Sequence, residues 1–449
     1  MKNNISNLAK VLNEDLNESV AFRVLSERGK KIYFPHKGIL GQSAEAKSAE
    51  INATIGTAFE NDGTPLVLSS VQKTIALPEK ELQSSFLYQP SFGKLQLRRK
   101  WAEKMLSKNP SLSGNTNEGT TVKFSEPVVT AALTHALSVS ASLFVNEGDT
   151  VLISDLYWDN YDLIFAESFG AKIELFNTFK NGNFDTESLK NALAEKIAVA
   201  KINQNAKKVI ILLNFPNNPT GYTITEKEAD EIVSILKSGA ENGLDLVVLL
   251  DDAYFGLVYE KGIFTESLFG KIANLHENLL AVKLDGPTKE DFVWGFRVGF
   301  ITFAFKGASD KQLKALTDKA AGTVRATISN APSLSQEILF AAYNSESYEN
   351  EKQEKFNTLR KRYEKIKEIL KSHPEYSKNF EAMPFNSGYF MCVKVLGVEP
   401  EAVRQECLKN GVGVIVLSGL IRIAFSSVAI DKLEVLFARL NKAITALKG

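Results

Sequence analysis

The sequence is poor in the residues that cross-link small secreted proteins or bind metals. Among its 449 residues are only two cysteines, Cys392 and Cys407, and four histidines spread along the chain. Two cysteines exclude a disulfide framework and favour a reducing compartment. Isolated cysteines are more often packing residues than reactive thiols. Scattered histidines do not predict a metal site, so we expect no metal.

An excess of charge of either sign is also missing. Lys plus Arg and Asp plus Glu both number 53, so bulk charge favours neither a nucleic-acid nor an anionic-membrane partner. The opening stretch "MKNNISNLAKVLNEDLNES" lacks the apolar core of a signal peptide. Residues 128–145 come closest to a membrane span, but they contain a histidine and several hydroxyl groups, which favours a buried helix. These features predict a soluble cytoplasmic protein.

Short apolar runs alternate with amphipathic stretches in the middle of the chain. Four runs are apolar on both faces, as strands of a covered parallel sheet are: 150–154, 208–214, 244–251 and 279–285. Between the second and third runs, Thr225 and Glu228 form a capping-box pattern before apolar residues at helical spacing. A strand, a capped helix and a strand make a βαβ unit. The sequence therefore predicts an α/β sheet with helices on both faces.

The pattern changes after about residue 330, where a long charged helix is expected over 347–373. Strand-like runs at 388–395 and 420–425 and a closing helix follow it. This part of the chain predicts a second, smaller α+β domain.

Polar residues follow three of the expected strands, at the edge where open α/β sheets bind ligands. "NFPNNPTG" follows the first and presents Asn217 and Asn218, although a plain Asn-Pro turn is a common alternative. The second ends at Asp251, which alone suits a helix cap, with Tyr254 close behind. The third leads to Lys289, eight residues before Arg297.

An acid, a phenol, an amine and an arginine match the needs of pyridoxal phosphate. Its aldehyde requires a lysine for the Schiff base and its pyridine nitrogen requires an acid. Its O3′ requires a hydrogen-bond donor and its phosphate an arginine. The three strand ends together therefore predict a site for this cofactor.

Three motifs occur in the order and spacing of class I aminotransferases: Asn218-Pro219-Thr220-Gly221, Asp251-x-Ala253-Tyr254 and Lys289-x7-Arg297-x-Gly299. Over roughly residues 50 to 440 the chain resembles the aspartate aminotransferases of the fold type I group. The resemblance implies a large cofactor-binding domain over 66–328 and a small domain built from both termini, 1–65 and 329–449.

The resemblance implies a role for each motif residue. Lys289 holds the cofactor as a Schiff base and then moves a proton at the substrate Cα as general base and acid. Asp251 keeps the ring nitrogen protonated, while Asn218 and Tyr254 donate hydrogen bonds to O3′. Arg297 binds the phosphate.

Further cofactor contacts follow from the same resemblance. In "LYWDNY" (156–161) Trp158 matches the ring that stacks on the pyridine, and in "YQPSFGKLQLR" (88–98) Tyr88 matches a tyrosine that reaches the neighbouring subunit's cofactor phosphate. The loop "TAALTHAL" (130–137) matches the phosphate loop, so the main chain at Ala132 and Leu133 is expected to donate to the phosphate. Thr288 is expected to add a hydroxyl.

Two positions depart from the family pattern. Gly286 stands where the family has a phosphate-binding hydroxyl, and Ala131-Ala132 stands where Ser and Gly are commonest. Asp285 and Glu290 flank the lysine and would raise its pKa if their carboxylates lie close to its amine.

Three residues bear on the substrate. Arg422 in "IRIAFSS" matches the arginine that grips the α-carboxylate, and Gly56 matches a glycine that approaches the same carboxylate. Arg325 in "RATISNAP" matches an arginine that enters the partner's site and binds a side-chain carboxylate, although a helix-end arginine without a ligand is the alternative. The resemblance thus implies a homodimer with shared sites that transaminates aspartate or glutamate.

Other functions remain open at this point. The same cofactor residues serve aromatic or broad-specificity aminotransferases, lyases and decarboxylases, and only the substrate pocket separates them. A regulatory protein on the same fold would usually add a DNA-binding segment, and the first 50 residues contain no helix-turn-helix pattern or basic patch.

Overall fold

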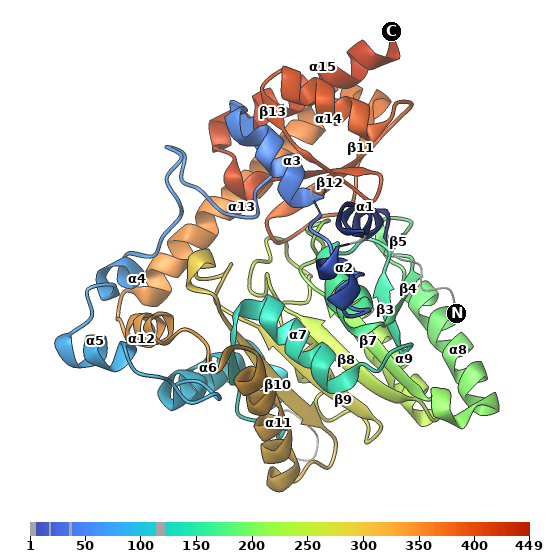
Figure 1. Ribbon diagram of the computed structural model, residues 1–449. Coiled ribbons are helices and arrows are strands. Elements are labelled where there is room, and N and C mark those ends of the chain that lie inside the picture. The colour runs from blue at the N-terminus through green and yellow to red at the C-terminus, as the bar shows by residue number, and fades with distance from the viewer. Residues whose placement is uncertain (1–5, 18, 36–37, 114–121) are drawn as a thin grey trace.

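The computed structural model describes residues 6–17, 19–35, 38–113 and 122–449 (Figure 1). Its centre is a seven-stranded sheet of order β2-β10-β9-β8-β7-β3-β4. Strand β10 runs antiparallel to both of its neighbours, and the other pairs are parallel. The strands are β2 (Val128–Ala131), β3 (Thr150–Ser154), β4 (Lys172–Phe176), β7 (Lys208–Asn214), β8 (Asp245–Asp251), β9 (Leu279–Asp285) and β10 (Val298–Phe305).

The four strands predicted from apolar runs are confirmed as β3, β7, β8 and β9. The prediction of a single helix over 128–145 is wrong for its first four residues. Val128–Ala131 form β2 and pair with β10, and only then does helix α7 (Ala132–Phe144) begin. Across the described parts of the chain, no helix is both long and apolar enough to cross a bilayer.

Helices cover both faces of the sheet, as the strand pattern predicts (Figure 1). Ile211 and Leu213 of β7 belong to one buried cluster, and Ile210 and Leu212 belong to another. The first cluster is completed by α8 (Thr186–Ile202), α9 (Glu226–Glu241) and α10 (Leu268–Ile272). The second is completed by α7, the π-helical segment η3 (Asp162–Glu167) and α11 (Asp310–Ile328).

Helix α9 begins where the sequence predicts. The Thr225 side chain accepts a hydrogen bond from the Glu228 amide, and the Glu228 side chain accepts one from the Thr225 amide. This reciprocal capping box satisfies two amide groups that the first turn leaves without intrahelical partners.

A second sheet of four antiparallel strands has the order β11-β12-β15-β14. Strand β1 (Ile51–Asn52) pairs with β13 (Val412–Gly413), so an N-terminal segment joins this C-terminal unit. The other elements of the unit are β11 (Phe380–Ala382), β12 (Phe390–Val395), β14 (Ile415–Leu417), β15 (Leu420–Ala424), α13 (Tyr348–Ser372), α14 (Pro400–Lys409) and α15 (Leu433–Lys448). Helix α13 is the predicted charged helix. The domain limits at residues 65/66 and 328/329 stay a prediction.

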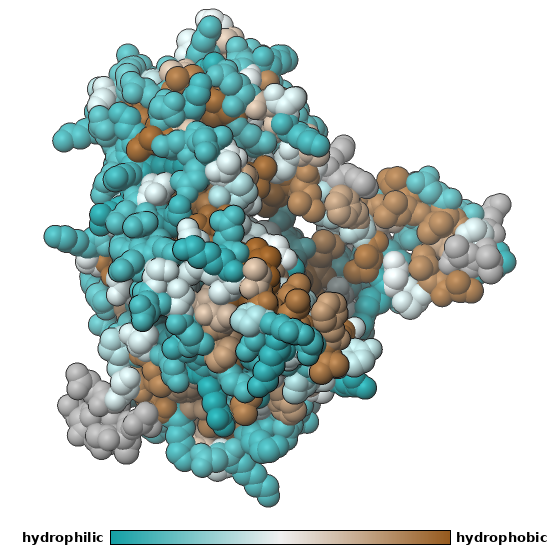
Figure 2. Space-filling model, turned by 90° about the vertical axis from the view of Figure 1, so that its left-hand side faces the viewer, coloured by the Kyte–Doolittle hydropathy of each residue, from teal (hydrophilic) through white to brown (hydrophobic). Residues whose placement is uncertain are grey.

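The remaining helices lie around these two units. Helices α4 (Ser69–Thr74), α6 (Leu95–Lys108) and α12 (Ser333–Ala342) contribute to a third buried cluster, and α5 (Glu79–Ser85) lies beside them. The N-terminal helices are α1 (Asn7–Leu16), α2 (Val20–Val24) and α3 (Ile39–Glu45). In Figure 2 the segment that carries α1 and α2 projects from the body and carries many apolar side chains. The small hairpin strands are β5 (Phe179–Lys180) and β6 (Asn183–Phe184).

Candidate active site

A cavity of about 380 Å³ opens where β7, β8 and β9 end. That volume lies in the range of small-molecule sites, and the carboxyl ends of parallel strands are where α/β sheets bind ligands. All predicted site residues except Tyr88, Arg325 and Asn217 line this cavity: Gly56, Ala132, Leu133, Trp158, Asn218, Asp251, Tyr254, Thr288, Lys289, Arg297 and Arg422. Side chains far apart in the sequence are therefore brought to one place.

Lys289 lies in the turn that follows β9. The Tyr389 hydroxyl donates a hydrogen bond of 2.6 Å to the Lys289 carbonyl, and the Lys289 amine lies 5.2 Å from the centre of the Tyr254 ring. Burial lowers the pKa of Lys289 to about 8, with the Asp251 carboxylate acting against this shift and Arg297 adding to it. A neutral amine is consequently far more available here than on a solvated lysine.

The two acids that flank Lys289 in sequence pair with other cations. Glu290 forms ion pairs with Lys108 and Lys352, while Asp285 pairs with Lys283. Neither acid is among the charges that shift the pKa of Lys289. Asp285 and Glu290 therefore do not raise the pKa of Lys289, because their carboxylates pair with other lysines.

Asp251 ends β8, and hydrogen bonds from three groups hold its carboxylate and its main-chain carbonyl. Tyr161 donates to its Oδ2 at 2.6 Å, and the Ala253 amide donates to its Oδ1 at 3.1 Å. Asn214, its register partner on β7, donates to the Asp251 carbonyl at 2.7 Å. Burial raises the pKa of Asp251 to about 6, against the lowering effects of the Tyr161 hydrogen bond and the Lys289 ammonium. The carboxylate is ionised at neutral pH and faces the cavity.

Arg422 is buried beside Asn218 without forming an ion pair among the described residues. Its Nη1 donates to Asn218 Oδ1 at 3.1 Å and its Nη2 to the Thr54 carbonyl at 3.0 Å. Its Nε finds no hydrogen-bond partner in the part of the chain that the structure describes, and its guanidinium lies 4.4 Å from the centre of the Phe390 ring. A buried guanidinium is costly without an anion, which points to an anionic ligand.

The amino end of α7 forms the floor of the cavity at Ala132, Leu133 and Thr134. The amides of a helix's first turn lack intrahelical partners, and no side chain among the described residues caps this one, so these amides and the helix dipole favour an anion there. Strand β10 packs closely against the start of α7: a Cβ on Gly299 would lie 2.5 Å from the Ala132 carbonyl carbon. With Arg297 also lining the cavity, this end fits a phosphate dianion.

Gly286 also packs closely against strand β10. A Cβ built at this position would come within 2.9 Å of the Val298 carbonyl oxygen and 3.0 Å of the Gly299 Cα. The departure from the family's hydroxyl residue therefore has a steric cause: β10 occupies the space that a side chain would need.

Tyr88 and Arg325 lie outside this chain's own cavity. The Tyr88 side chain is 88% exposed, and Arg325 is exposed near the end of α11, where its Nη1 donates to Ser329 Oγ at 2.7 Å. Their predicted place in the neighbouring subunit's site stays a prediction.

Asn217, expected to face the crevice with Asn218, is instead part of the turn. Its Oδ1 accepts hydrogen bonds from the Thr220 amide and hydroxyl, and its Nδ2 donates to the Leu156 carbonyl.

Sequence reasoning missed several residues of the cavity wall. Ile39 and Leu40 reach it from α3, and Trp294 and Phe390 line it as well. Tyr161 belongs to the stretch that was singled out for Trp158, but its bond to Asp251 has no sequence signal. The α3 residues carry no motif that could have pointed to the site.

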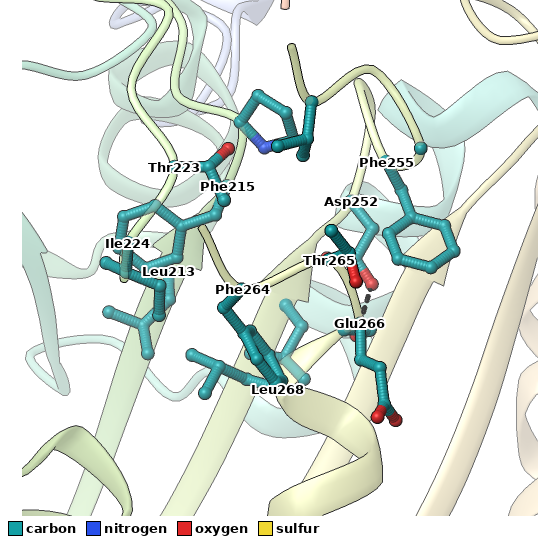
Figure 3. A pocket seen from close by; sticks show the side chains of 15 residues that line it. Leu213, Phe215, Thr223, Ile224, Asp252, Phe255, Phe264, Thr265, Glu266 and Leu268 are labelled. Carbon is teal, nitrogen blue, oxygen red and sulfur yellow. Dashed lines mark hydrogen bonds between the residues drawn. The ribbon is translucent and has the colours of Figure 1, made fainter. Parts of the chain in front are cut away.

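A second, smaller cavity lies behind Asp252 (Figure 3). Its walls include Leu213, Phe255 and Phe264, and Asp252 accepts a hydrogen bond from Ser267 there. The cavity measures about 10 Å³, which is room for one water molecule at most. It is therefore a packing gap and not a substrate site.

Comparison with known proteins places this geometry in context. The sequence model described as aminotransferase class I and II matches residues 57–440. An aspartate aminotransferase from Bacillus sp. (strain YM-2) is 29% identical over 49% of this chain and 50% of its own length. Another aspartate aminotransferase, from Bacillus subtilis, is 26% identical over 58% of this chain and 57% of its own length. The chain thus matches only about half the length of these curated relatives.

Solved structures share the fold over nearly the whole chain. An aminotransferase from Anaerococcus prevotii superposes with a TM-score of 0.79 at 23% identity, covering 94% of this chain and 99% of the other. A Pyrococcus horikoshii kynurenine aminotransferase, solved with PMP, gives a TM-score of 0.77 at 16% identity and covers 96% and 99%. At these identities the likeness shows the fold.

Proposed function

Because the chain belongs to the family of class I and II aminotransferases, we propose that it transfers an amino group from aspartate or glutamate to a 2-oxo acid such as 2-oxoglutarate. The family and the fold class inferred from the sequence motifs are confirmed. The observation that carries transamination of an amino acid is Arg422, a buried guanidinium without an ion-pair partner among the described residues, in the same cavity as Lys289. The choice of aspartate or glutamate rests on Arg325. We expect the reaction to take place in the cytoplasm.

The cofactor of this family is pyridoxal 5′-phosphate, and the groups that line the cavity fit it. The amino end of α7 and Arg297 would hold the phosphate, Asp251 the ring nitrogen and Lys289 the aldehyde. Trp158 would cover one ring face. When bound, pyridoxal phosphate supplies a sink for the electron pair left at the substrate Cα.

Lys289 is the proposed general base and acid. With a pKa of about 8 its amine has a larger neutral fraction near neutral pH than a solvated lysine has, and with the cofactor bound it would take the proton from the substrate Cα and return one on the cofactor side. Asp251 keeps the ring nitrogen protonated from the opposite end. Burial raises the pKa of the Tyr254 phenol, which therefore remains protonated and donates to O3′ together with Asn218.

Arg422 is the proposed receptor for the substrate α-carboxylate. Its planar fork already donates to Asn218 and Thr54, and its Nε has no partner among the described residues. A carboxylate would complete that set with two parallel charge-assisted bonds. Gly56 lines the same cavity, and it packs against the Phe390 ring, because a Cβ at that position would lie 3.2 Å from Phe390 Cζ.

A homodimer would supply the remaining groups. Phe86, Leu87 and Tyr88 are 84%, 68% and 88% exposed, and such a run of large apolar residues is typical of an interface. In a dimer with shared sites, Tyr88 would reach the partner's phosphate and Arg325 would bind the second carboxylate of the partner's substrate. Arg325 is thus the proposed basis of dicarboxylate preference.

A second candidate is transamination of aromatic or other apolar amino acids. Ile39, Leu40, Trp294 and Phe390 give the cavity an apolar wall, which suits an uncharged side chain. Arg422 and Lys289 would act identically on either substrate class.

A panel of amino donors with 2-oxoglutarate separates the two candidates. We expect the highest kcat/KM with aspartate, and we expect Arg325→Ala to reduce turnover of aspartate while sparing phenylalanine. Turnover of hydrophobic donors but not of aspartate would favour the second candidate. The absorption band of the bound cofactor, present in the native protein and absent in Lys289→Ala, tests the enzyme assignment itself.

A further inference from the structure

Tyr161 joins the cavity wall to the acid beneath it. Its side chain is almost fully buried, and its hydroxyl donates to Asp251 Oδ2 at 2.6 Å. The Ala253 amide donates to the other carboxylate oxygen at 3.1 Å. Asn214 Nδ2 also donates to that second oxygen, at 3.4 Å, so Tyr161 is the donor to Oδ2 and the three bonds together orient the plane of the carboxylate.

The ring of Tyr161 also supports Trp158. The two rings meet edge to face with centres 5.6 Å apart, and Tyr157 stacks on the other side at 6.3 Å. Tyr161 immediately precedes the π-helical segment η3. Such single-turn irregularities are frequent at functional sites, and Trp158 and Tyr161 both line the cavity just before this one.

The groups around Asp251 determine how the Tyr161 hydroxyl affects ionisation of the carboxylate. The Tyr161 bond and the Lys289 ammonium stabilise the ionised carboxylate, as does the Ala253 amide, while burial and the neighbouring Asp252 oppose ionisation. Burial and the adjacent carboxylate raise the pKa of Tyr161 well above its usual value, so it acts only as a donor. A donor to the charged form lowers the pKa of the acceptor, so losing that donor would raise it.

We propose that Tyr161 is a positioning residue that keeps Asp251 ionised and aimed at the cofactor's ring nitrogen. The inference rests on the role proposed for Asp251 above. It extends that role to a tyrosine that does not itself contact the ring nitrogen. Without the hydroxyl, Asp251 is protonated over a wider pH range and loses its preferred plane.

The test is the affinity of the apoprotein for pyridoxal phosphate, measured across pH by quenching of tryptophan fluorescence. The Tyr161→Phe substitution keeps the ring and removes one oxygen. We expect affinity to fall about tenfold at neutral pH, and the acid limb of the affinity profile to move up by about one pH unit. The cofactor's own ionisations are common to all variants, so they cancel from the comparison.

Tyr157→Phe is the matched control, because the Tyr157 hydroxyl donates to Asp162 and not to Asp251. It should leave both the affinity and the acid limb unchanged. A double-mutant cycle with Asp251→Asn identifies the route of the effect. If Tyr161 acts through Asp251, adding Tyr161→Phe to Asp251→Asn costs no further affinity.

The outcomes separate this inference from the proposal on which it rests. An equal loss in both backgrounds, or an acid limb that does not move, overturns the role of Tyr161 and leaves Asp251 in place. An Asp251→Asn protein that binds the cofactor with native affinity overturns both. A thermal unfolding midpoint near the native value for each variant shows that the comparison is made on folded protein.

Discussion

At the scale of single residues, burial moves the pKa values of two opposed groups towards each other. The pKa of Asp251 is raised to about 6 and the pKa of Lys289 is lowered to about 8. Burial disfavours the charged form of each group, while the opposite charge of the other group partly stabilises it. The Lys289 amine and the Asp251 carboxylate are therefore linked electrostatically in the protein alone.

These values predict how fast the apoprotein takes up pyridoxal phosphate at different pH. Asp251 is ionised above about pH 6, and the Lys289 amine becomes mostly neutral above about pH 8. The rate of covalent attachment should therefore rise between these values and level off above the upper one. Stopped-flow absorbance after mixing measures it. A rate that still climbs steeply towards pH 10.4, about the ordinary pKa of lysine, would show that the pKa of Lys289 is not lowered.

Arg422 gives a second prediction at this scale. In Arg422→Lys the positive charge remains, but the fork that matches a carboxylate is lost. We expect KM for every amino donor to rise by about tenfold or more, with little change in cofactor affinity. Steady-state kinetics and a fluorescence titration measure the two quantities.

The control for Arg422→Lys is Arg404→Lys, which changes a buried arginine paired with Glu401 and Glu45 outside the cavity. It should leave KM unchanged. An unchanged KM in Arg422→Lys itself would contradict the assignment of the α-carboxylate site.

At the scale of elements, the ends of β8 and β9 are tied together beneath the site. Lys283 is fully buried and forms ion pairs with Asp252, which follows β8, and with Asp285, which ends β9. The Trp101 indole donates to Asp285 as well, at 3.0 Å. These contacts hold the end of β8 that carries Asp251 and the turn that carries Lys289, and they explain why polar residues are buried there.

The close approach of β10 leads to a prediction about Gly286. Gly286→Ser would restore the hydroxyl residue of the family, but its Cβ would meet the Val298 carbonyl at 2.9 Å. We expect it to lower the free energy of unfolding by about 1–3 kcal/mol and not to improve cofactor affinity. Urea unfolding and a cofactor titration measure these effects.

Gly295→Ser is the matched control for Gly286→Ser, since no atom lies within 4 Å of a Cβ added at Gly295. This control should leave the stability close to native. If Gly286→Ser instead binds the cofactor more tightly with native stability, the steric explanation for the missing hydroxyl is wrong.

The elements also show how much the sequence could predict. The strands β3, β7, β8 and β9 and the cap of α9 were predictable, because each leaves a local pattern of apolar residues or capping groups. Strand β2 was missed because its apolar residues fit a helix equally well, and only pairing with β10 distinguishes the two. The role of Tyr161 and the steric reason for Gly286, which the sequence marked only as a departure from the family pattern, were missed for a related reason: their contacts join segments far apart in sequence.

At the scale of the whole molecule, the exposed apolar surface and the two predicted site residues outside the cavity require one explanation. Val24 is 74% exposed on the projecting N-terminal segment (Figure 2), and Phe86 and Leu87 are exposed beside Tyr88. A second copy of the chain would cover such surface, and a two-fold axis would carry Tyr88 and Arg325 of each copy towards the other.

Subunit mixing tests this arrangement directly. A Lys289→Ala subunit lacks the amine but keeps Arg325, and an Arg325→Ala subunit keeps the amine. If Arg325 serves the partner's site, a hybrid dimer has one site with both residues and one with neither. After random reassembly about half of the dimers are hybrids, so aspartate turnover should recover to about a quarter of the native rate. Turnover that stays at the mean of the two parents would mean that Arg325 does not act across a dimer interface.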